Sequence, residues 1–326
     1  MIVLDPSRVR RVLAAAAFAP LLSLSACGSD DPVAKPAGAT SLAPIVSPTT
    51  QGLIAVWGSS AEDVWAVGSV GTIVHFDGRE WKVAVSPTTE NLSAVTGTGP
   101  DDVWAVGDTG ETLHYDGKSW TEKVSGLDET FLGVWVSGPK DVWIVGVDTI
   151  DSAGILRHWD GTKWDDVEVP GSVSLWEVWG TGPGDVWMVG TDINGNGLIE
   201  RGDGMNFDTV AFQGTSLRSI WGAQPTDVWV AAYDGSIQHW DGTTWTMTTG
   251  PTSAGSLLGI WGSGAGDLWA VGLKGVALRN SDGKAWIVSN TGTESVLWSV
   301  WGGSPKDIWA VGSAGTIRHF DGTSWN

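Results

Sequence analysis

The sequence predicts an all-β fold, a seven-bladed β-propeller with four antiparallel strands in each blade. The first observation is an Asp-hydrophobic-Trp segment that recurs at intervals of roughly 40 residues, the length of a propeller blade. Its tryptophans are Trp65, Trp104, Trp143, Trp187, Trp229, Trp269 and Trp309. The second observation is that every repeat holds four short β-branched or aromatic runs, separated by Gly, Asp and Ser, without a helical period. Radial repetition of such four-stranded units gives a propeller.

The four expected strands of each repeat are called a to d in chain order. Strand a carries Leu-x-x-Val-Trp-Gly, strand b begins with Asp-Val-Trp, strand c ends with His-aromatic, and strand d begins at the tryptophan after Asp-Gly. The a–b and c–d connections keep a constant length, whereas the b–c connection is longer in the third and fourth repeats. Because b–c hairpins lie on one face of a propeller, that face is the variable one. Variable loops on a rigid scaffold are the usual place for recognition.

The propeller is expected to span residues 41–326 and to be closed by its N-terminal strand. The chain ends at Asn326, where strand d of blade 7 would begin, and residues 42–50 match residues 81–89 in register. The N-terminal segment should therefore complete blade 7. Such a strand removes an open sheet edge that would invite aggregation.

The first 26 residues have the pattern of an export signal. Arg8, Arg10 and Arg11 precede an apolar run that is too short to span a bilayer. The run ends in Leu24-Ser25-Ala26-Cys27, which resembles the lipobox of bacterial lipoproteins, and the resemblance implies lipid attachment at Cys27. The other interpretation is an ordinary signal peptide followed by an incidental cysteine.

Three segments follow from this interpretation: a lipoprotein signal peptide over 1–26, a flexible tether over 27–40 and the propeller over 41–326. The tether is rich in Gly, Ala, Pro and Asp and lacks periodicity. By resemblance to lipoproteins without aspartate at the second mature position, Gly28 implies an outer-membrane lipoprotein. It would face the periplasm or the cell surface.

The third and fourth segments of the repeat, such as residues 71–81, resemble the Asp-box (BNR) repeat of sialidase-like and photosystem-assembly-factor propellers. The resemblance is loose, because His-aromatic mostly replaces the usual serine or threonine ahead of the aspartate; residues 281–286 come nearest. Together with the lipobox, the chain is similar to the Trp-rich β-propeller lipoproteins of bacteria.

Charge and cysteine content exclude several classes of function. The 18 basic and 37 acidic residues give a net charge of -19, which would repel a phosphate backbone, so nucleic acid is not an expected partner. One cysteine cannot form an internal disulfide or a Cys-based zinc site. A monomeric propeller is expected.

The repeats account for most residues that could perform catalysis, so no catalytic residue is assigned. The five histidines, which share one position of strand c, are His75, His114, His158, His239 and His319. A catalytic histidine would be expected in one blade only, so these repeated histidines are interpreted as structural. The repeated aspartates are interpreted as turn formers. A sialidase-type set of arginines, tyrosine and aspartate is missing from the pattern, whereas a glycosidase that uses two carboxylates stays open.

The blade 4 hairpin contains the alternation of oxygen ligands that a calcium loop needs. Its candidate ligands are Asp192, Asn194, Asn196, Leu198 through its carbonyl, and Glu200. The segment resembles the calcium hairpins of integrin propellers. A plain hairpin with Asn-Gly turn chemistry is the alternative. Asp148 and Asp151 on the blade 3 hairpin would add negative potential to the site or lend a ligand.

The residue after the strand a leucine should ring the mouth of the central channel on the variable face. This mouth ring consists of Ile54, Ser93, Leu132, Trp176, Arg218, Leu258 and Trp298. Trp176, Arg218 and Trp298 could stack a sugar or a peptide group there. Tyr233, alone on a hairpin tip, is a further candidate for ligand binding. Ordinary packing between blades is the alternative.

These observations predict a non-enzymatic, lipid-anchored, extracytoplasmic binding or scaffold module. It would recognise a protein or a glycan through the variable face, with calcium as a possible cofactor. Two alternatives remain: a glycan-acting hydrolase of the Asp-box propeller type, and an assembly factor for an envelope complex.

Overall fold

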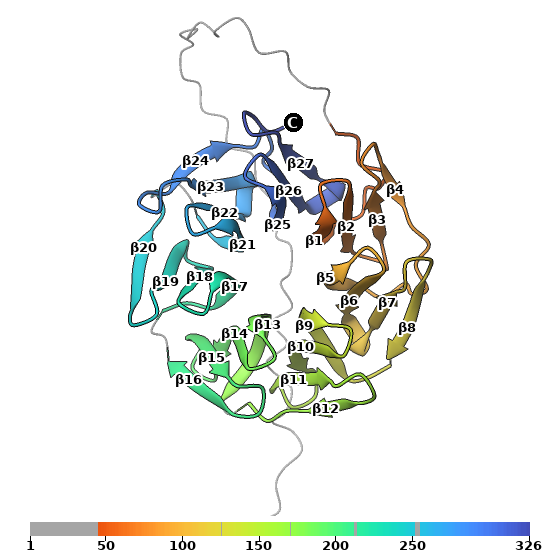
Figure 1. The fold of residues 1–326 in the computed structure, drawn as a ribbon, viewed down its shortest axis with the longest axis vertical. Helices are drawn as coiled ribbons and strands as arrows, with labels where there is room; N and C mark the ends of the chain where they lie inside the picture. The colour runs from red at the N-terminus through yellow and green to blue at the C-terminus, as the bar shows by residue number, and fades with distance from the viewer. Residues whose placement is uncertain (1–44, 125, 170, 212–213, 252–254) are drawn as a thin grey trace, which may run out of the picture. The chain divides into compact units, whose positions relative to one another are not determined.

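The structure is a computed structural model that describes residues 45–124, 126–169, 171–211, 214–251 and 255–326. These residues form seven antiparallel sheets arranged around a central axis, as Figure 1 shows. The signal peptide, Cys27 and the tether lie outside the described residues. No helix in the described part of the chain is long and apolar enough to cross a membrane.

The strands of the first four blades follow one another in chain order. Blade 1 comprises β1 (Leu53–Ser60), β2 (Asp63–Gly68), β3 (Ile73–Phe76) and β4 (Trp81–Val83). Blade 2 comprises β5 (Leu92–Gly99), β6 (Asp102–Gly107), β7 (Thr112–Tyr115) and β8 (Trp120–Val124). Blade 3 comprises β9 (Glu129–Gly138), β10 (Asp141–Asp148), β11 (Gly154–Trp159) and β12 (Trp164–Asp166). Blade 4 comprises β13 (Ser172–Gly182), β14 (Asp185–Asp192), β15 (Gly197–Gly202) and β16 (Phe207–Ala211).

The remaining three blades repeat the same order. Blade 5 comprises β17 (Leu217–Gln224), β18 (Asp227–Ala232), β19 (Ser236–Trp240) and β20 (Trp245–Thr249). Blade 6 comprises β21 (Leu257–Gly264), β22 (Asp267–Gly272), β23 (Val276–Asn280) and β24 (Ile287–Asn290). Blade 7 comprises β25 (Leu297–Ser304), β26 (Asp307–Gly312) and β27 (Ile317–Phe320). Short 3-10 turns follow strand b in three blades: η2 (Asp108–Gly110), η3 (Leu273–Gly275) and η4 (Ser313–Gly315).

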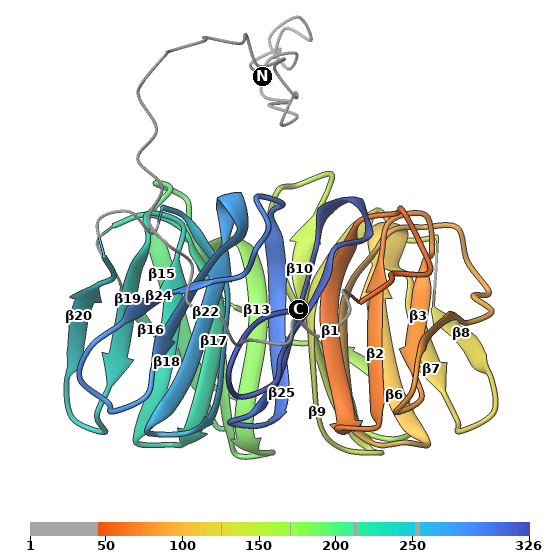
Figure 2. The same ribbon diagram turned by 90° about the horizontal axis from the view of Figure 1, so that it is seen from above.

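Every sheet is a simple meander in which strands pair with their neighbours in sequence, so the predicted strand order a to d is confirmed. Strand a lies at the centre of the ring and strand d at its perimeter (Figure 1). The strands run between two faces (Figure 2), with the a–b and c–d turns at one end and the b–c hairpins at the other. The b–c hairpins thus occupy one face, as predicted.

Blade 7 has three strands among the described residues, and a bridge between Phe320 and Trp325 begins its outer edge. The predicted fourth strand falls partly on residues 42–44, outside the described residues, and Ile45 to Thr50 are not in a strand. The segment nevertheless repeats the course of its blade 1 counterpart. A Cβ added to Gly315 would lie 2.0 Å from the Thr49 carbonyl oxygen, as one added to Gly71 would lie 2.1 Å from the Thr88 oxygen.

The hydrophobic core lies between blades, because strand b is buried along almost its whole length and its tryptophan packs on the next blade. Trp65 meets Trp120 edge to face, with ring centroids 5.3 Å apart. Trp309 meets Trp81 in the same way at 5.3 Å, which joins blade 7 to blade 1. Such contacts contribute roughly 0.5–1.5 kcal/mol beyond the buried area.

A second tryptophan ring joins the inner strands. It consists of Trp57, Thr96, Trp135, Trp179, Trp221, Trp261 and Trp301. Each tryptophan lies against a glycine of the next blade; a Cβ added to Gly222 would be 2.4 Å from Cη2 of Trp179. At the one junction where the ring has Thr96, the next blade has Val136 in place of that glycine. Small and large residues therefore complement each other around the whole ring.

The five histidines make the hydrogen bonds and ring contacts within their own blades that the structural interpretation expects. His75 stacks on Trp65 with ring centroids 4.0 Å apart, and its Nε2 lies 2.5 Å from Oδ1 of Asp63 at the start of strand b. Arg201 and Arg279 take the histidine's place in blades 4 and 6. The equivalent histidine–aspartate pairs are His114–Asp102, His158–Asp141, His239–Asp227 and His319–Asp307.

The two classes of repeated aspartate have different roles, and the interpretation of both as turn formers is wrong for one of them. The Asp-Gly aspartates do form turns: Oδ1 of Asp77 accepts the backbone N–H groups of Arg79 and Glu80. Asp63 instead accepts hydrogen bonds from His75 and Ser59. Although burial raises its pKa, these bonds hold the pKa of Asp63 below its ordinary value.

Candidate functional site

The centre of the ring is a cavity of about 510 Å³ lined by strand a of all seven blades. A cavity of this size falls within the range of small-ligand sites. All seven members of the mouth ring line it, as predicted. The tryptophan ring lines it as well, three residues further along strand a in every blade. The inner strands therefore present two levels of side chains to one cavity.

The mouth ring lies toward the b–c hairpins. Nε1 of Trp176 donates to Oγ1 of Thr191, near the end of strand b of blade 4, at 3.3 Å. Nε1 of Trp298 donates to Oγ of Ser313 in the blade 7 hairpin, also at 3.3 Å. The two tryptophans are thus held at the variable face on blades 4 and 7.

The structure brings Trp176, Arg218 and Tyr233 together across the junction of blades 4 and 5. Cζ of Arg218 lies 3.8 Å from the Trp176 ring centroid and 5.1 Å from that of Tyr233. The Arg218 guanidinium has no carboxylate or hydrogen-bonding partner among the described residues, and its Nε is buried without an acceptor. Burial lowers the pKa of Arg218. Trp298 stands apart from this cluster, on blade 7.

Glu177, which the sequence analysis did not single out, lines the same cavity. Its Oε2 accepts the backbone N–H of Ile220 in blade 5 at 2.7 Å. Burial raises the pKa of Glu177 to about 7, against hydrogen bonds from Ser219 and Ile220 that lower it. The other blades hold small residues at this position, namely Ala55, Ala94, Gly133, Ser219, Gly259 and Ser299. Comparing this position between repeats would have revealed Glu177.

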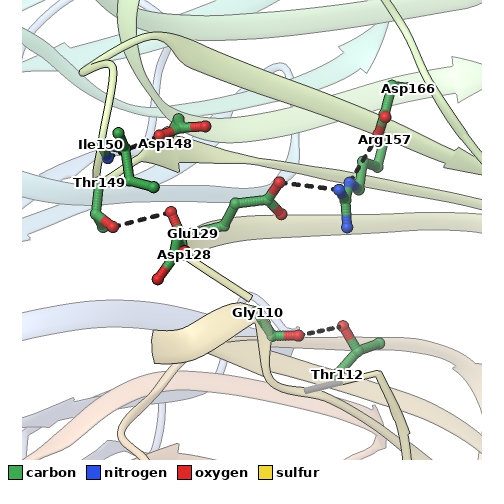
Figure 3. A network of polar contacts seen from close by, with 9 residues as sticks. All are labelled: Gly110, Thr112, Asp128, Glu129, Asp148, Thr149, Ile150, Arg157 and Asp166. Atoms are coloured by element: carbon green, nitrogen blue, oxygen red, sulfur yellow. Dashed lines mark hydrogen bonds and ion pairs between the residues drawn. The ribbon is translucent and has the colours of Figure 1, made fainter. Parts of the chain in front are cut away.

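The blade 3 hairpin is tied down by polar contacts, which Figure 3 shows. Asp148 accepts the backbone N–H groups of Ile150 and Asp151, at 2.7 and 3.0 Å, and these bonds lower its pKa. Oγ1 of Thr149 donates to the Asp128 carbonyl at 2.8 Å. The candidate residue Asp148 is therefore engaged in the turn, while Asp151 and Ile150 remain exposed.

In the same blade, Arg157 joins strand c to strands a and d. Its guanidinium contacts Glu129 at 2.9 Å and Asp166 at 2.8 Å (Figure 3). Arg157 thus has two carboxylate partners, whereas Arg218 has none in the part of the chain that the structure describes.

The blade 4 hairpin does not gather the expected calcium ligands. Oδ1 of Asp192 accepts the backbone N–H groups of Asn194 and Asn196, both at 2.8 Å. Leu198 and Glu200 lie in strand β15 rather than at the tip, paired with Gly190 and Met188. Oε1 of Glu200 accepts a hydrogen bond from Thr209, and burial raises the pKa of Glu200. No cluster of three acidic, His or Cys side chains suited to a metal occurs among the described residues.

Exposed apolar side chains mark the hairpin tips of the variable face. They are Val70, Ile150, Ile193 and Tyr233, and the last three stand on the consecutive blades 3, 4 and 5. Ile150 is 70% exposed and Ile193 81%. Among the exposed large apolar residues, Met205 is at a turn of the opposite face. Three of the four apolar tips therefore belong to blades 3 to 5, the part of the ring that includes Arg218, and Val70 belongs to blade 1.

Comparisons with known proteins support the fold but do not assign the chain to a family. Neither a protein family nor a curated protein matches the sequence. Among solved structures, YCF48 bound to D1 peptide is similar with a TM-score of 0.67 and 17% identity, covering 85% of this chain and 98% of that one. YCF48 from Cyanidioschyzon merolae gives 0.65 and 18%, covering 85% and 97%. The WD40 β-propeller domain of Doa1 gives 0.68 and 16%, covering 83% and 93%.

These likenesses agree with the seven-bladed propeller predicted from the repeats. At such low identity they carry the architecture and not an activity.

Proposed function

We propose that this protein is a non-enzymatic, lipid-anchored binding module that works outside the cytoplasm and holds a protein partner against its variable face. The observation that carries the proposal is the position of the apolar hairpin tips beside the channel mouth. Ile150, Ile193 and Tyr233 expose apolar surface on the consecutive blades 3, 4 and 5, and blades 4 and 5 also carry Trp176 and Arg218 at the channel mouth. Exposed apolar residues gathered on one side of a face are typical of a protein interaction site.

A protein partner fits this surface better than a neutral glycan. Sugar rings stack on free aromatic faces, but one face of Trp176 is covered by the Arg218 guanidinium. Ile150 and Ile193 offer aliphatic contacts, which suit apolar side chains of a partner. A propeller of the same fold has been solved with a peptide of the D1 protein, so the architecture is compatible with peptide binding. That precedent also keeps an envelope-complex assembly factor as a form of the same proposal.

The rival hypothesis of a glycan hydrolase has no specific observation in its favour. Glycosidases need a pair of free carboxylates, but the carboxylate of Asp63 is engaged within its blade by hydrogen bonds from Ser59 and His75. The same arrangement recurs in blades 2 and 3, which indicates a structural role. Glycan binding is retained as an outcome of the test below.

The experiment places a photo-crosslinking amino acid at Ile193 or at Met205. Both residues belong to blade 4 and both are 81% exposed, but they lie on opposite faces. In cells that produce the protein, we expect discrete crosslinked products from position 193 and none from position 205. Equal products from both faces, or none from position 193, would refute the proposal. Binding to a glycan array that Ile193→Asp leaves intact would also refute it.

Lipid anchoring is tested separately at the candidate attachment residue. We expect palmitate labelling of the full chain, and its loss in Cys27→Ser. Unchanged labelling in that variant would refute the lipoprotein part of the proposal and leave the binding part standing.

A further inference from the structure

The strongest unexplained feature of the cavity is a cation without a counterion. Three other arginines of the described residues have carboxylate partners: Arg157 with Glu129, Arg201 with Asp185 and Arg279 with Asp267. Arg218 has none there, and Tyr233 is the titratable group that acts on its pKa. Burying a cation without a partner costs free energy, so its retention at a cavity mouth calls for an explanation.

The structure itself contains the completed form of this arrangement twice. Cζ of Arg201 lies 4.3 Å from the Trp187 ring centroid while the guanidinium pairs with Asp185 at 2.8 Å. Arg279 likewise lies 5.2 Å from the Trp269 centroid and pairs with Asp267 at 2.8 Å. In both cases a tryptophan face supports the guanidinium and a carboxylate binds its edge. Arg218 has the supporting Trp176 face at 3.8 Å, and only the carboxylate is missing.

We propose that the Arg218 guanidinium, held by Trp176 and Tyr233 at the channel mouth, binds a carboxylate of a peptide segment. The inference rests on the proposed function and names the chemistry of its ligand. The planar guanidinium presents paired N–H donors that match a carboxylate in two parallel hydrogen bonds. The aromatic residues fix its orientation, so little side-chain freedom is lost when the ligand binds.

A peptide source is favoured by what surrounds the cation. The exposed tips Ile150 and Ile193 lie on the two blades before Arg218 and can contact apolar residues next to the carboxylate. The cavity of about 510 Å³ has room for the end of a chain or for an acidic side chain. The carboxylate could thus be a C-terminus or an Asp or Glu side chain, and the experiment separates these sources.

The test uses immobilised full-length protein and three pools of random hexapeptides. The first pool lacks Asp and Glu and has a free C-terminal carboxylate; the second is the same pool amidated. The third contains Asp and Glu and is amidated. We expect retention of the first or the third pool at least about tenfold above the second, because a charge-assisted hydrogen bond is worth that much or more. The preferred pool identifies the source of the carboxylate.

Two arginine variants complete the design. Arg218→Met should reduce the retained pool to the level of the amidated, acid-free pool. Arg318→Met is the matched control, since Arg318 also has a buried Nε without an acceptor but lies in strand c of blade 7, and this variant should bind as the wild type does. Thermal unfolding followed by circular dichroism verifies that both variants are folded.

The inference fails if no pool is retained, if the amidated acid-free pool binds equally well, or if Arg218→Met keeps the preference. It also fails if an oligosaccharide of glucuronate binds through Arg218 while the peptides do not. In each case the crosslinking from Ile193 still decides the proposed function independently.

Discussion

The same seven inner strands line the channel at two levels, and the two levels differ in how far the residue type repeats from blade to blade. The tryptophan ring repeats one residue in six of seven blades and pairs each tryptophan with a glycine of the next blade. The mouth ring, three positions earlier on strands such as β13, holds residues as different as Ser93, Arg218 and Trp298. Repetition therefore marks the residues that hold blades together, and departure from it marks those that are free to serve another purpose.

The largest difference should appear between two tryptophans of strand β13. Trp179→Ala removes a ring packed against Gly222 and should cost about 3–5 kcal/mol in the free energy of unfolding. Trp176→Ala removes mainly the contact with the Arg218 cation and should cost about 1 kcal/mol, with loss of ligand binding. Urea denaturation measures both. Equal losses of unfolding free energy would show that both tryptophans contribute alike to stability, contrary to the proposed difference between the two levels.

A smaller effect is expected at the only junction that departs from the Trp–Gly rule. Thr96→Trp should overfill the space beside Val136 and cost about 1–3 kcal/mol. The double variant Thr96→Trp/Val136→Gly recreates the pair found at the other junctions and should recover most of the loss. A double-mutant cycle from urea denaturation measures the coupling. Strictly additive effects would mean that the two residues do not share one space.

Glu177 lies between the two levels, and its pKa predicts how stability depends on pH. Its folded pKa of about 7 is above the ordinary value of 4.5, so between these values the folded state holds a proton that the unfolded state has lost. Stability should therefore fall as pH rises from 4.5 to 7, by up to roughly 1.4 kcal/mol per pH unit from this group. Glu177→Gln keeps an acceptor for the Ile220 N–H and should remove this contribution.

Melting temperatures of the wild type and Glu177→Gln over pH 4 to 8 test this expectation. The variant should gain stability over the wild type only as pH rises. Parallel curves would mean that Glu177 titrates normally.

Calcium should produce the smallest effect. With Leu198 and Glu200 in strand β15, the hairpin tip has only Asp192, Asn194 and Asn196 to offer, and Asp192 is already engaged by backbone N–H groups. If millimolar calcium raises the melting temperature, Asp192→Ala should abolish the shift and Glu200→Gln should preserve it. A shift that depends on Glu200 would contradict the register of β15.

The fold could be predicted because the same sequence pattern recurs in seven repeats, with only a few positions that depart from it. The spacing of Asp-Val-Trp and Asp-Gly defines four strands, and seven copies define the ring. The mouth ring could be predicted because its residues share one position when the seven repeats are aligned. The structure confirms that Trp176 and Arg218 line the channel.

The remaining features depend on which residues face each other across strands or blades, and linear spacing does not contain that information. The Asp-Val-Trp motif does not indicate that Asp63 bonds to His75, because the two residues lie on different strands. Glu200 matched a calcium motif by counting residues, but strand pairing with Met188 places it inside the sheet. The contact between Arg218 and Tyr233 joins strand a to a hairpin tip in blade 5 and has no local signature.

The b–c hairpins have one more property with a practical consequence. In four of them a non-glycine residue adopts a left-handed conformation just before a glycine that does the same: Val70, Thr109, Lys274 and Ala314, with φ between 54° and 57°. This conformation costs about 1–2 kcal/mol for an ordinary residue and somewhat more for a β-branched one such as Val70 or Thr109. The turn is thus specified by the backbone and the following glycine. Residues at these tips can be exchanged almost independently of the blades beneath them, which makes the rim a natural scaffold for a library of engineered binding surfaces.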